Sequence, residues 1–405
     1  MRVLLVIHNA YTDRTSGAAH SMRTLMEWLA DAGHDCRVLA TARFDLGAPR
    51  NINAHLNGLG VALKRHPPPK RFTKFLRGKG RRGRGLGYVE FELNGISVTM
   101  LPTRHNNRQQ PNRREAEQYI FHFEEIREAA PPDLVICYGD HPVIGEVLRR
   151  SWTSGIKTLF RLANYGYERR DYFEHVDHVL VPSPFLARYY RDTVGIECTG
   201  IPSPLNYRDI VAPTEDRAFV TFVNPSPQKG VGLFARLADM LGSMRPDIPV
   251  LVVQSATDAT LLNSIPGIDF SKYPQILASE PVAQPADFFA LTRIILVPSV
   301  FNEPFGRVAA EALINGVPAL VSDRGALPDT VGDAGTALPL PSWLTPESDR
   351  IVDVGEAQPW FDAVCGLWDD EAAYAAASAR ARSVAGDLYD EAALRRRYAE
   401  FIAGL

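Results

Sequence analysis

Short apolar segments that alternate with helical patterns are the feature that most constrains the fold of this chain. The N-terminal run RVLLVIHN is followed by a loop, a helical pattern and a second apolar run, CRVLA. The helical pattern consists of Met22, Leu25, Met26 and Leu29, and Gly33 stands where a helix C-cap belongs. An order of strand, loop, helix and strand is typical of a doubly wound parallel sheet.

The same alternation begins again in the second half of the chain. At 405 residues the protein is too long for one ordinary hydrophobic core, and the two prolines in 202–207 are typical of a linker. The sequence therefore predicts an α/β protein of two doubly wound, Rossmann-like domains that face each other across a cleft. We expect an N-terminal domain at 1–203, a C-terminal domain at 204–375, and a helical tail at 376–405 that could pack back on the N-terminal domain.

Residues 45–115 interrupt this alternation, and we interpret them as an insertion that the sheet does not need. Two alternating runs around Asn94-Gly95 predict a β-hairpin there. Upstream, the basic window 64–84 contains ten basic side chains and no acidic one. Three interpretations stay open: a solvated mobile loop, which we favour, a surface for an anionic acceptor or a membrane, and a nucleic-acid site. Phe72 and Phe75 are spaced so that a short amphipathic turn could contact a membrane interface.

Composition excludes several classes of protein. With 45% hydrophobic and 22% charged residues and a net charge of −3, the chain is neither disordered, fibrous nor basic throughout. Its four cysteines lie far apart, which argues against a disulfide framework or a zinc cluster and favours a reducing compartment. No segment approaches the roughly 20 apolar residues of a membrane helix, and the first apolar run is too short for a signal peptide. We therefore expect a cytoplasmic protein without a transmembrane segment.

The most informative segment is 299–328, with the sequence SVFNEPFGRVAAEALINGVPALVSDRGALP. A strand ends just before it, and a helix is predicted from near Phe305 to Asn315-Gly316. The free amides at such a helix start suit a phosphate or a pyrophosphate. Glu303 and Glu311 flank this start, where their carboxylates can accept hydrogen bonds from vicinal hydroxyls. Lys229, in the equivalent turn NPSPQKG, supplies the cation, so the pattern predicts a nucleotide-sugar site.

These residues resemble a known family. The Glu-x7-Glu arrangement of Glu303 and Glu311, with the surrounding PFGRVAAEAL-NGVPAL-SDRGALP, is similar to the retaining GT-B glycosyltransferases of family 4, most closely between about Val220 and Pro341. The resemblance implies a C-terminal domain that binds an activated sugar and an N-terminal domain that binds the acceptor. It also implies a metal-independent reaction without a cofactor, in which charge on the departing diphosphate is balanced by Lys229, Arg307 and the helix start.

The resemblance assigns roles to individual residues. Catalytic roles fall to Glu303, which would contact the sugar hydroxyls, to His141, near the reacting carbon, and to Lys229, on the phosphate. The position of a usual phosphate-binding arginine is Asn224 here. The remaining donor-binding positions are the backbone of Phe305, Gly306, Arg307 and Val308, the ribose-binding Glu311, Gly17 in the glycine-rich loop position after Ser16, and Val282 within 281–283 beside the base. Alternatively, Gly17 serves only a turn and His141 is a polar residue at the sheet rim.

The function predicted in this way is transfer of a hexose from a nucleoside diphosphate sugar to an acceptor hydroxyl, with UDP favoured and GDP possible. The acceptor stays open among a small molecule, a glycan and a lipid-linked molecule. One alternative is an epimerase or hydrolase that acts on a nucleotide-sugar with the same fold. Another is a non-catalytic RNA- or membrane-associated protein with a degenerate donor site, which the basic window and Asn224 favour.

Overall fold

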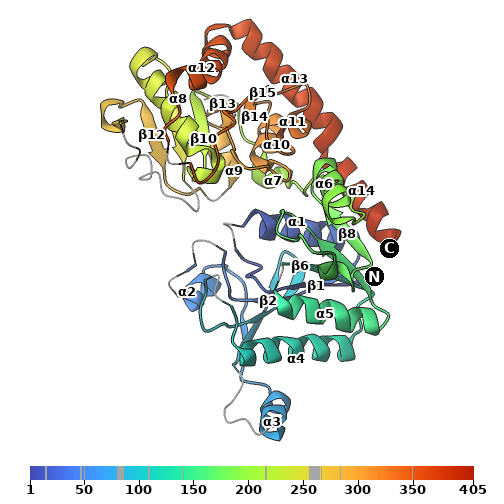
Figure 1. The fold of residues 1–405 in the computed structure, drawn as a ribbon. Coiled ribbons are helices and arrows are strands. Elements are labelled where there is room, and N and C mark those ends of the chain that lie inside the picture. Colours follow the sequence, from blue (N-terminus) through green and yellow to red (C-terminus); the bar gives the residue numbers. More distant parts are fainter. Residues whose placement is uncertain are drawn as a thin grey trace. The chain divides into compact units, whose positions relative to one another are not determined.

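The computed structural model describes the chain except residues 14–15, 46–47, 50, 80–85, 108–109, 140, 215–216, 255–264, 266, 283 and 349. The described chain forms two compact units, each with its own sheet: a mostly parallel one in unit 1 and a parallel one in unit 2 (Figure 1). Unit 1 comprises Met1–Pro182, Ala187–Pro204 and Arg395–Leu405, and unit 2 comprises Ser183–Leu186 and Leu205–Leu394. The assignment of acceptor binding to the first half and donor binding to the second stays a prediction.

Unit 1 is built on a nine-stranded sheet with the order β3-β4-β5-β2-β1-β6-β7-β8-β9. Its central strands are continuous apolar runs buried on both faces, as the sequence predicts. The strands are β1 (Arg2–Ile7), β2 (Asp35–Thr41), β3 (Lys64–His66), β4 (Tyr88–Leu93), β5 (Ile96–Leu101), β6 (Leu134–Tyr138), β7 (Lys157–Arg161), β8 (His178–Val181) and β9 (Thr199–Gly200). The helices are α1 (Gly17–Asp31), α2 (Ile52–Asn57), α3 (Lys70–Gly78), α4 (Arg113–Ala129) and α5 (Pro142–Thr153), together with parts of α6 (Pro184–Val194) and α14 (Glu391–Ala403).

The hairpin around Asn94-Gly95 forms as predicted, but it belongs to the sheet. Asn94 and Gly95 have φ angles of 51° and 76°, the left-handed geometry that a two-residue hairpin turn requires. β5 pairs in parallel with β2 and antiparallel with β4, so the expectation that 45–115 is dispensable for the sheet is wrong. The physical reason is that Ile96, Val98 and Met100 are buried and extend the core beyond β2.

The basic window is largely folded as well. Lys64–His66 form the edge strand β3, and Lys70–Gly78 form α3, so the favoured interpretation as a loop is wrong for these residues. The remaining residues 80–84 of the window lie outside the described residues. α3 forms because Phe72 and Leu76 are buried while the basic side chains face outward. Phe72 is therefore a core residue and does not contact a membrane.

Unit 2 has a six-stranded parallel sheet with the order β12-β11-β10-β13-β14-β15. Its strands are β10 (Phe219–Val223), β11 (Val250–Val253), β12 (Ile276–Ser279), β13 (Thr292–Val297), β14 (Ala319–Ser322) and β15 (Thr336–Leu338). Its helices are α7 (Tyr207–Ile210), α8 (Val231–Met244), α9 (Pro285–Phe289), α10 (Arg307–Ile314), α11 (Leu327–Val331), α12 (Val354–Asp369) and α13 (Glu371–Tyr389). The predicted α/β class with two Rossmann-like, doubly wound units is confirmed.

The C-terminal helices divide between the units. α13 packs on α10, where the Ser378 hydroxyl donates to the carbonyl of Gly316 at 2.6 Å. Beyond Leu394 the chain belongs to unit 1, where the Tyr398 hydroxyl donates to the carbonyl of Pro202 at 2.9 Å and Arg395 pairs with Asp31 at 2.8 Å. Nowhere in the described part of the chain is a helix both long and apolar enough to cross a bilayer.

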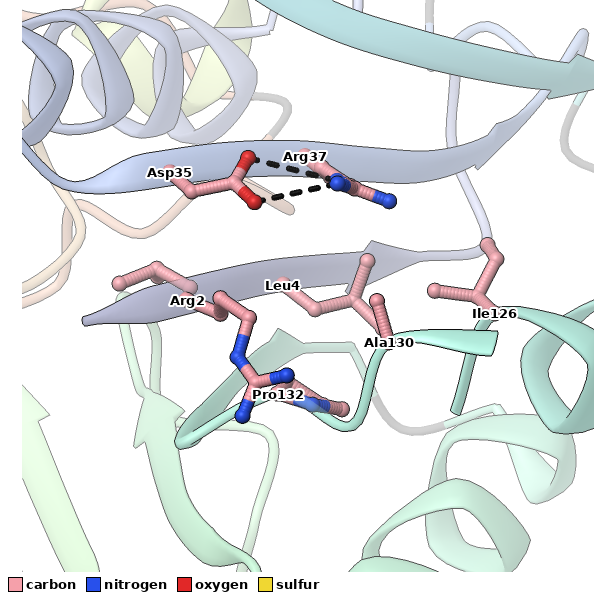
Figure 2. A pocket seen from close by; sticks show the side chains of 8 residues that line it. Arg2, Leu4, Asp35, Arg37, Ile126, Ala130 and Pro132 are labelled. Carbon is pink, nitrogen blue, oxygen red and sulfur yellow. Dashed lines mark hydrogen bonds and ion pairs between the residues drawn. The ribbon is translucent and has the colours of Figure 1, made fainter. Parts of the chain in front are cut away.

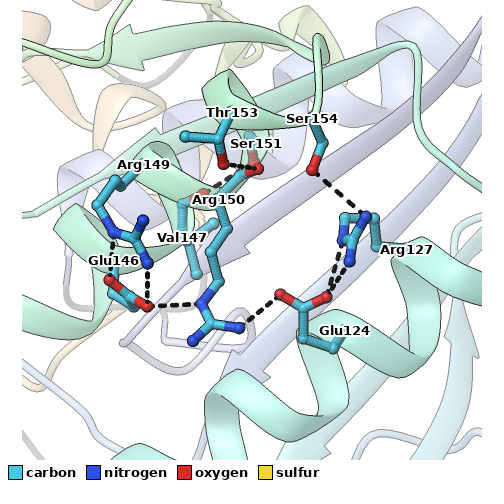
Figure 3. A network of polar contacts seen from close by, with 9 residues as sticks. All are labelled: Glu124, Arg127, Glu146, Val147, Arg149, Arg150, Ser151, Thr153 and Ser154. Carbon is cyan, nitrogen blue, oxygen red and sulfur yellow. Dashed lines mark hydrogen bonds and ion pairs between the residues drawn. The ribbon is translucent and has the colours of Figure 1, made fainter.

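A network of charged side chains joins α4 to α5 on the surface of unit 1 (Figure 3). The Arg150 guanidinium lies at its centre, 2.9 Å from a Glu124 oxygen and 2.6 Å from a Glu146 oxygen. Arg127 also pairs with Glu124, and Arg149 pairs with Glu146 at 2.8 Å. The hydrogen bond from Arg149, with a further one from Arg150, lowers the pKa of Glu146 to about 2. Arg150 pairs with carboxylates of both helices, and Arg127 of α4 also donates to the Ser154 hydroxyl at the end of α5 at 3.3 Å.

We predict that Arg150→Met lowers the free energy of unfolding by about 1 kcal/mol, because Glu124 and Glu146 lose their shared cation. Arg149→Met is the matched control and should cost under about 0.5 kcal/mol, since its pair is exposed and local to α5. Against a raising effect of burial, the hydrogen bond from Arg150 lowers the pKa of Glu124 below 4.5, so the difference between wild type and Arg150→Met should shrink as the pH falls below that value. Urea unfolding at several pH values measures it, and equal losses for the two variants would contradict a bridging role for Arg150.

Candidate functional site

The order of the strands identifies one position in each unit where a ligand crevice is expected. In a doubly wound sheet, the strand order reverses at one point, and a crevice forms there outside the carboxyl ends of the two adjacent strands. In unit 2 this switch point lies between β10 and β13, and in unit 1 it lies between β1 and β6. The turn after β10 contains Lys229, and the loop after β13 contains Glu303. The Val300 amide donates to the carbonyl of Gln228 at 3.0 Å, which ties the two turns together.

Lys229 and Glu303 are in direct contact. The Lys229 ammonium lies 2.6 Å from a Glu303 carboxylate oxygen, and the Ser299 hydroxyl donates to the same oxygen at 2.6 Å. The Glu303 side chain is 7% exposed and that of Lys229 is 31% exposed. Lys229 also lies over the Phe301 ring, 4.9 Å from its centroid. Lys229 and Glu303 are 74 residues apart in the sequence, but they meet because β10 and β13 are neighbours in the sheet. Two residues that were predicted to bind separate parts of a donor therefore form one cluster.

The backbone that carries Glu303 is held by its neighbours on both sides. Glu303 forms a parallel bridge with Gly325, and the Ala326 amide donates to its carbonyl at 2.8 Å. Gly325 has a φ angle of 63°, and a Cβ atom there would lie 2.4 Å from the Glu303 nitrogen. On the other side, the Ser183 hydroxyl donates to the carbonyl of Pro304 at 2.5 Å. The position of the Glu303 carboxylate therefore depends on the close approach of the Glu303 and Gly325 backbones, which only glycine at 325 permits.

The helix that follows Glu303 begins two residues later than predicted. α10 starts at Arg307, and its N-cap is Gly306 with a φ angle of 86°. Phe305 is buried against Tyr389, and its carbonyl accepts a hydrogen bond from the Thr330 hydroxyl, so it belongs to the support of the loop. The amides at the helix start are those from Arg307 and Val308 onward. The predicted start near Phe305 is wrong because the left-handed Gly306 separates Phe305 from the helix.

Left-handed glycines also distinguish the two helix starts of this cluster from others in the protein. α8 follows β10 and has Gly230 as its N-cap, with a φ angle of 84°. A Cβ atom on Gly230 would lie 1.9 Å from the Pro298 carbonyl oxygen. Among the described residues, no side chain caps α8 or α10, whereas Ser16 caps α1 and a capping box closes α4. The first-turn amides of α8 and α10 are thus not covered by a capping side chain, as an anion site requires.

Glu311 lies one turn inside α10 and pairs with Arg307. The Arg307 guanidinium donates to a Glu311 oxygen at 2.8 Å, and Glu311 is 4% exposed. Burial raises the pKa of Glu311, and the charge of Arg307 opposes this shift. The structure therefore places a buried carboxylate and a guanidinium at the helix start, which fits hydroxyl and phosphate binding side by side.

The backbone conformation at position 224 favours asparagine. Asn224 ends β10 in the left-handed region, with a φ angle of 61°, and its carbonyl accepts the Ser226 amide at 2.7 Å. Asn tolerates this conformation better than arginine does. Within the described chain its buried Oδ1 atom has no hydrogen-bond partner. An unpaired buried amide oxygen is costly, so this atom of the switch point stands out as one that lacks a donor.

Two predicted donor-binding positions lie on elements other than those of this cluster. Val282 follows β12, and β11 and β10 separate that strand from β13. Ala283, next to it, lies outside the described residues. Gly17 is the first residue of α1 in unit 1, where Ser16 caps the helix at the Ala19 amide. The role of Gly17 in donor binding stays a prediction.

His141 lies at the switch point of unit 1, beside a residue that the sequence analysis missed. His141 is the N-cap of α5, and its Nδ1 atom accepts the Val143 amide at 3.1 Å. The proton of the neutral ring is therefore on Nε2, which makes this atom a hydrogen-bond donor. The ring stacks on His8 at a centroid distance of 4.2 Å and an interplanar angle of 13°. Because His8 directly follows β1 and β1 pairs with β6, the strand order alone could have indicated this neighbourhood.

His8 is held neutral in this stack. It is 3% exposed, and it also contacts the Tyr119 ring at 5.6 Å. Burial lowers the pKa of His8 to about 3, with further lowering by His141 and Arg43. Its Nδ1 atom has no partner among the residues that the structure describes. A buried histidine with a strongly lowered pKa at a switch point marks His8 as a candidate functional residue of unit 1.

A pocket at the opposite end of the unit 1 sheet is not part of this arrangement (Figure 2). Arg2, Asp35 and Arg37 line it at the amino ends of β1 and β2, and the Arg37 guanidinium pairs with Asp35 at 3.1 Å. Ligands of doubly wound sheets bind at the carboxyl ends, so we do not assign function to this pocket.

In comparisons with known proteins, the segment that matches a protein family lies in unit 2. Residues 206–347 match the family model described as Glycosyl transferases group 1. The D-inositol 3-phosphate glycosyltransferases of Paenarthrobacter aurescens and of an Arthrobacter species are 28% and 31% identical to this chain over 154 and 153 residues. These matches cover 35% and 36% of this chain, and 33% and 32% of those proteins. The chain therefore spans about a third of the length of the curated relatives that it matches.

Solved structures match over the whole chain and establish the fold. Sucrose-phosphate synthase from Thermosynechococcus elongatus has a TM-score of 0.68 at 16% identity, covering 100% of this chain and 99% of that chain. Anabaena HepE in complex with UDP-glucose has a TM-score of 0.66 at 13% identity, with 100% of both chains covered. At such identities the likeness concerns the fold alone. The expected GT-B fold is thereby confirmed.

Gly325→Ala should lower the free energy of unfolding by about 2 kcal/mol or more, because the new Cβ would meet the Glu303 backbone and the φ angle of 63° is unfavourable. Gly366→Ala is the matched control. Gly366 lies inside α12 with nothing within 4 Å of its Cβ position, so alanine should raise stability by up to about 1 kcal/mol. Denaturant unfolding of both variants measures the difference, and a neutral Gly325→Ala would contradict the close approach.

His8→Phe keeps an aromatic ring in the stack and removes the titration. Since the pKa of His8 is lowered from 6.5 to about 3, protonation favours the unfolded chain, and the native state loses stability as the pH falls through this interval. The slope contributed by one such group is up to about 1.4 kcal/mol per pH unit. We predict a shallower loss of stability between pH 6.5 and 3 in His8→Phe than in wild type. The exposed His105→Gln is the control, and unchanged slopes in both variants would refute a neutral, buried His8.

Proposed function

We propose that the chain is a glycosyltransferase that moves a hexose from a nucleoside diphosphate sugar to an acceptor hydroxyl. The observation that carries this proposal is the cluster at the switch point of unit 2. There a cation, two buried carboxylates and an uncapped helix start converge on the carboxyl ends of β10 and β13. A diphosphate needs the cation and the amides, and the hydroxyls of a sugar and a ribose need the carboxylates.

The proposed division of work follows from the contacts. The Lys229 ammonium and the first-turn amides of α10 bind the diphosphate, and Arg307 adds a second positive charge. Glu303 accepts hydrogen bonds from the transferred sugar, and Glu311 accepts them from the ribose. Because Lys229 and Glu303 pair with each other at 2.6 Å, the donor must take over both partners of this ion pair. A neutral or singly charged ligand would not repay the separation of the pair.

The finer features rest on the family resemblance and on the ligands bound in solved structures of the same fold. HepE was solved in complex with UDP-glucose, and pneumococcal GtfA in complex with UDP and GlcNAc. These complexes support a UDP-sugar as the favoured donor, with a GDP-sugar as the second choice. We propose retention of configuration and metal independence. The bond from the anomeric carbon to the diphosphate breaks, the bond to the acceptor oxygen forms on the same face, and the acceptor proton passes to the departing phosphate oxygen.

The first unit contributes the remaining proposed roles. His141 would contact the transferred sugar, where its Nε2–H group acts as a donor and not as a base. The acceptor would be a small molecule, a glycan or a lipid-linked molecule, and the matched inositol phosphate glycosyltransferases make a phosphorylated polyol the first class to try. We propose a cytoplasmic location for the reaction, where nucleotide-sugars are available.

Nucleotide binding tests the proposal directly. We expect UDP or GDP at 100 times its dissociation constant to stabilise the protein by about 2.7 kcal/mol. Lys229→Met and Glu311→Gln should each weaken binding at least about tenfold, because one removes a phosphate-binding charge and the other a carboxylate acceptor. Lys272→Met and Glu347→Gln, at positions of unit 2 outside the cluster, are the controls. Thermal shift and calorimetry, with and without EDTA, measure these effects.

Two outcomes of the same experiments would favour the alternatives. Stabilisation by no nucleotide at all would favour a non-catalytic binding protein. Turnover of a nucleotide-sugar at the same rate without any acceptor would favour a hydrolase or an epimerase. A loss of binding in EDTA that Mg²⁺ restores would contradict metal independence but not nucleotide-sugar binding.

A further inference from the structure

The proposed donor site leaves one prominent feature of unit 1 without a role, the basic helix α3. Figure 1 shows α3 beyond α4 at the margin of unit 1, away from the body of the sheet. It follows the edge strand β3, which pairs only with β4. The helix is anchored by one side, where Phe72 and Leu76 are buried and the Phe72 ring contacts Phe121 of α4 at 5.2 Å. The opposite side faces outward.

The outward side of α3 is cationic along its whole length. Lys70, Lys74 and Arg77 are exposed and follow one another at i, i+4 and i+7, so their side chains form one stripe. Across the described chain, none of the three is in an ion pair, whereas Arg71 beside them pairs with Glu125 at 3.1 Å. Like charges at this spacing destabilise a helix. Fold stability therefore does not explain the stripe, and an external anionic partner does.

The charge distribution of the whole chain makes the stripe more distinctive. The basic window 64–84 has ten basic side chains and no acidic one, and the rest of the chain sums to 34 − 47 = −13. Averaged over its surface, the acidic remainder of the chain is repelled by an anionic surface, whereas α3 is attracted to it. This contrast would favour an orientation in which α3 faces the anionic surface.

Phe75 distinguishes a membrane from a nucleic acid. Its side chain is 41% exposed at the flank of the cationic stripe, where an apolar ring can enter a lipid interface. A protein that binds single-stranded nucleic acid needs a free ring face on which a base stacks. The Lys79 ammonium already lies over the Phe75 ring, 4.4 Å from its centroid, and Phe72 stacks on it at 6.0 Å. Both contacts take up ring surface that a stacked base would need, which favours a lipid surface over a nucleic acid.

We propose that α3 docks the protein on an anionic phospholipid surface, with Lys70, Lys74 and Arg77 at the headgroup phosphates and Phe75 in the interface. The contact is reversible, because three cations and one ring supply far less than a membrane-spanning helix. It is also sensitive to salt, because exposed charges are screened within a Debye length of about 10 Å at 0.1 M. This inference does not depend on the proposed transfer reaction.

Co-sedimentation with vesicles tests the proposal on the full chain. We expect binding to vesicles of phosphatidylcholine with about one third phosphatidylglycerol, and at least about tenfold weaker binding to pure phosphatidylcholine. Lys70→Glu/Lys74→Glu/Arg77→Glu should abolish the binding to anionic vesicles. Phe75→Ser should weaken it several-fold and leave its dependence on salt unchanged, because the ring contributes the apolar part of the contact.

A variant with the same change in net charge distinguishes an effect of the α3 stripe from an effect of the protein's net charge. Arg380→Glu/Arg396→Glu/Arg397→Glu reverses three exposed charges elsewhere and should keep vesicle binding. Nucleotide binding and thermal unfolding of the α3 variant show that it is folded, and they distinguish a failure here from a failure of the proposed function. Equal loss in the two triple variants would overturn the proposal. So would tighter binding to a single-stranded RNA oligonucleotide than to anionic vesicles, lost in the same α3 variant.

Discussion

Close approach of backbone segments at the switch point of unit 2 is the constraint on which the candidate site depends. At Gly230 and Gly325 the neighbouring backbone leaves less than 2.5 Å for a Cβ atom, and both residues have left-handed φ angles. Glycine at these two positions lets the turn after β10 and the loop after β13 lie against each other. Lys229 and Glu303 then meet although 74 residues separate them. Without this approach, the cation and the carboxylate would belong to unconnected loops.

The ion pairs that result are poor choices for stability. Glu303 and Glu311 are buried, and each has a cation beside it, Lys229 and Arg307 respectively. Removing such charges from water costs several kcal/mol per ion, and apolar residues of equal volume often stabilise as well or better. The raised pKa of Glu311 shows that burial outweighs its partner. Two such pairs at adjacent turns are better explained by ligand chemistry than by fold stability, which is the physical basis of the proposed donor site.

The sequence predicted those parts that local signals determine. Buried parallel strands, the Asn94-Gly95 turn and the glycine after α10 were predictable because each depends on neighbours in the chain. The pairing of β5 with β2 was not, since nothing local distinguishes a hairpin in a sheet from a hairpin in a loop. His8 was missed for the same reason: a histidine after a strand acquires meaning only when another strand end, here that of β6, is placed beside it. Left-handed Gly306, which delays α10 by two residues, has no signal beyond glycine itself.

The two switch points have the same topology but differ in the charges of the side chains at their strand ends. In unit 2 the strand ends hold full charges in pairs, with Lys229 against Glu303. In unit 1 the equivalent strand ends hold two stacked imidazoles, of which His8 is neutral at physiological pH and His141 presents a donor from Nε2. Burial disfavours the protonated form of His8, which is why its pKa is low and its ring carries no charge. The imidazoles of the first unit therefore offer hydrogen bonds to hydroxyl groups, and the second unit offers charge, which suits a diphosphate.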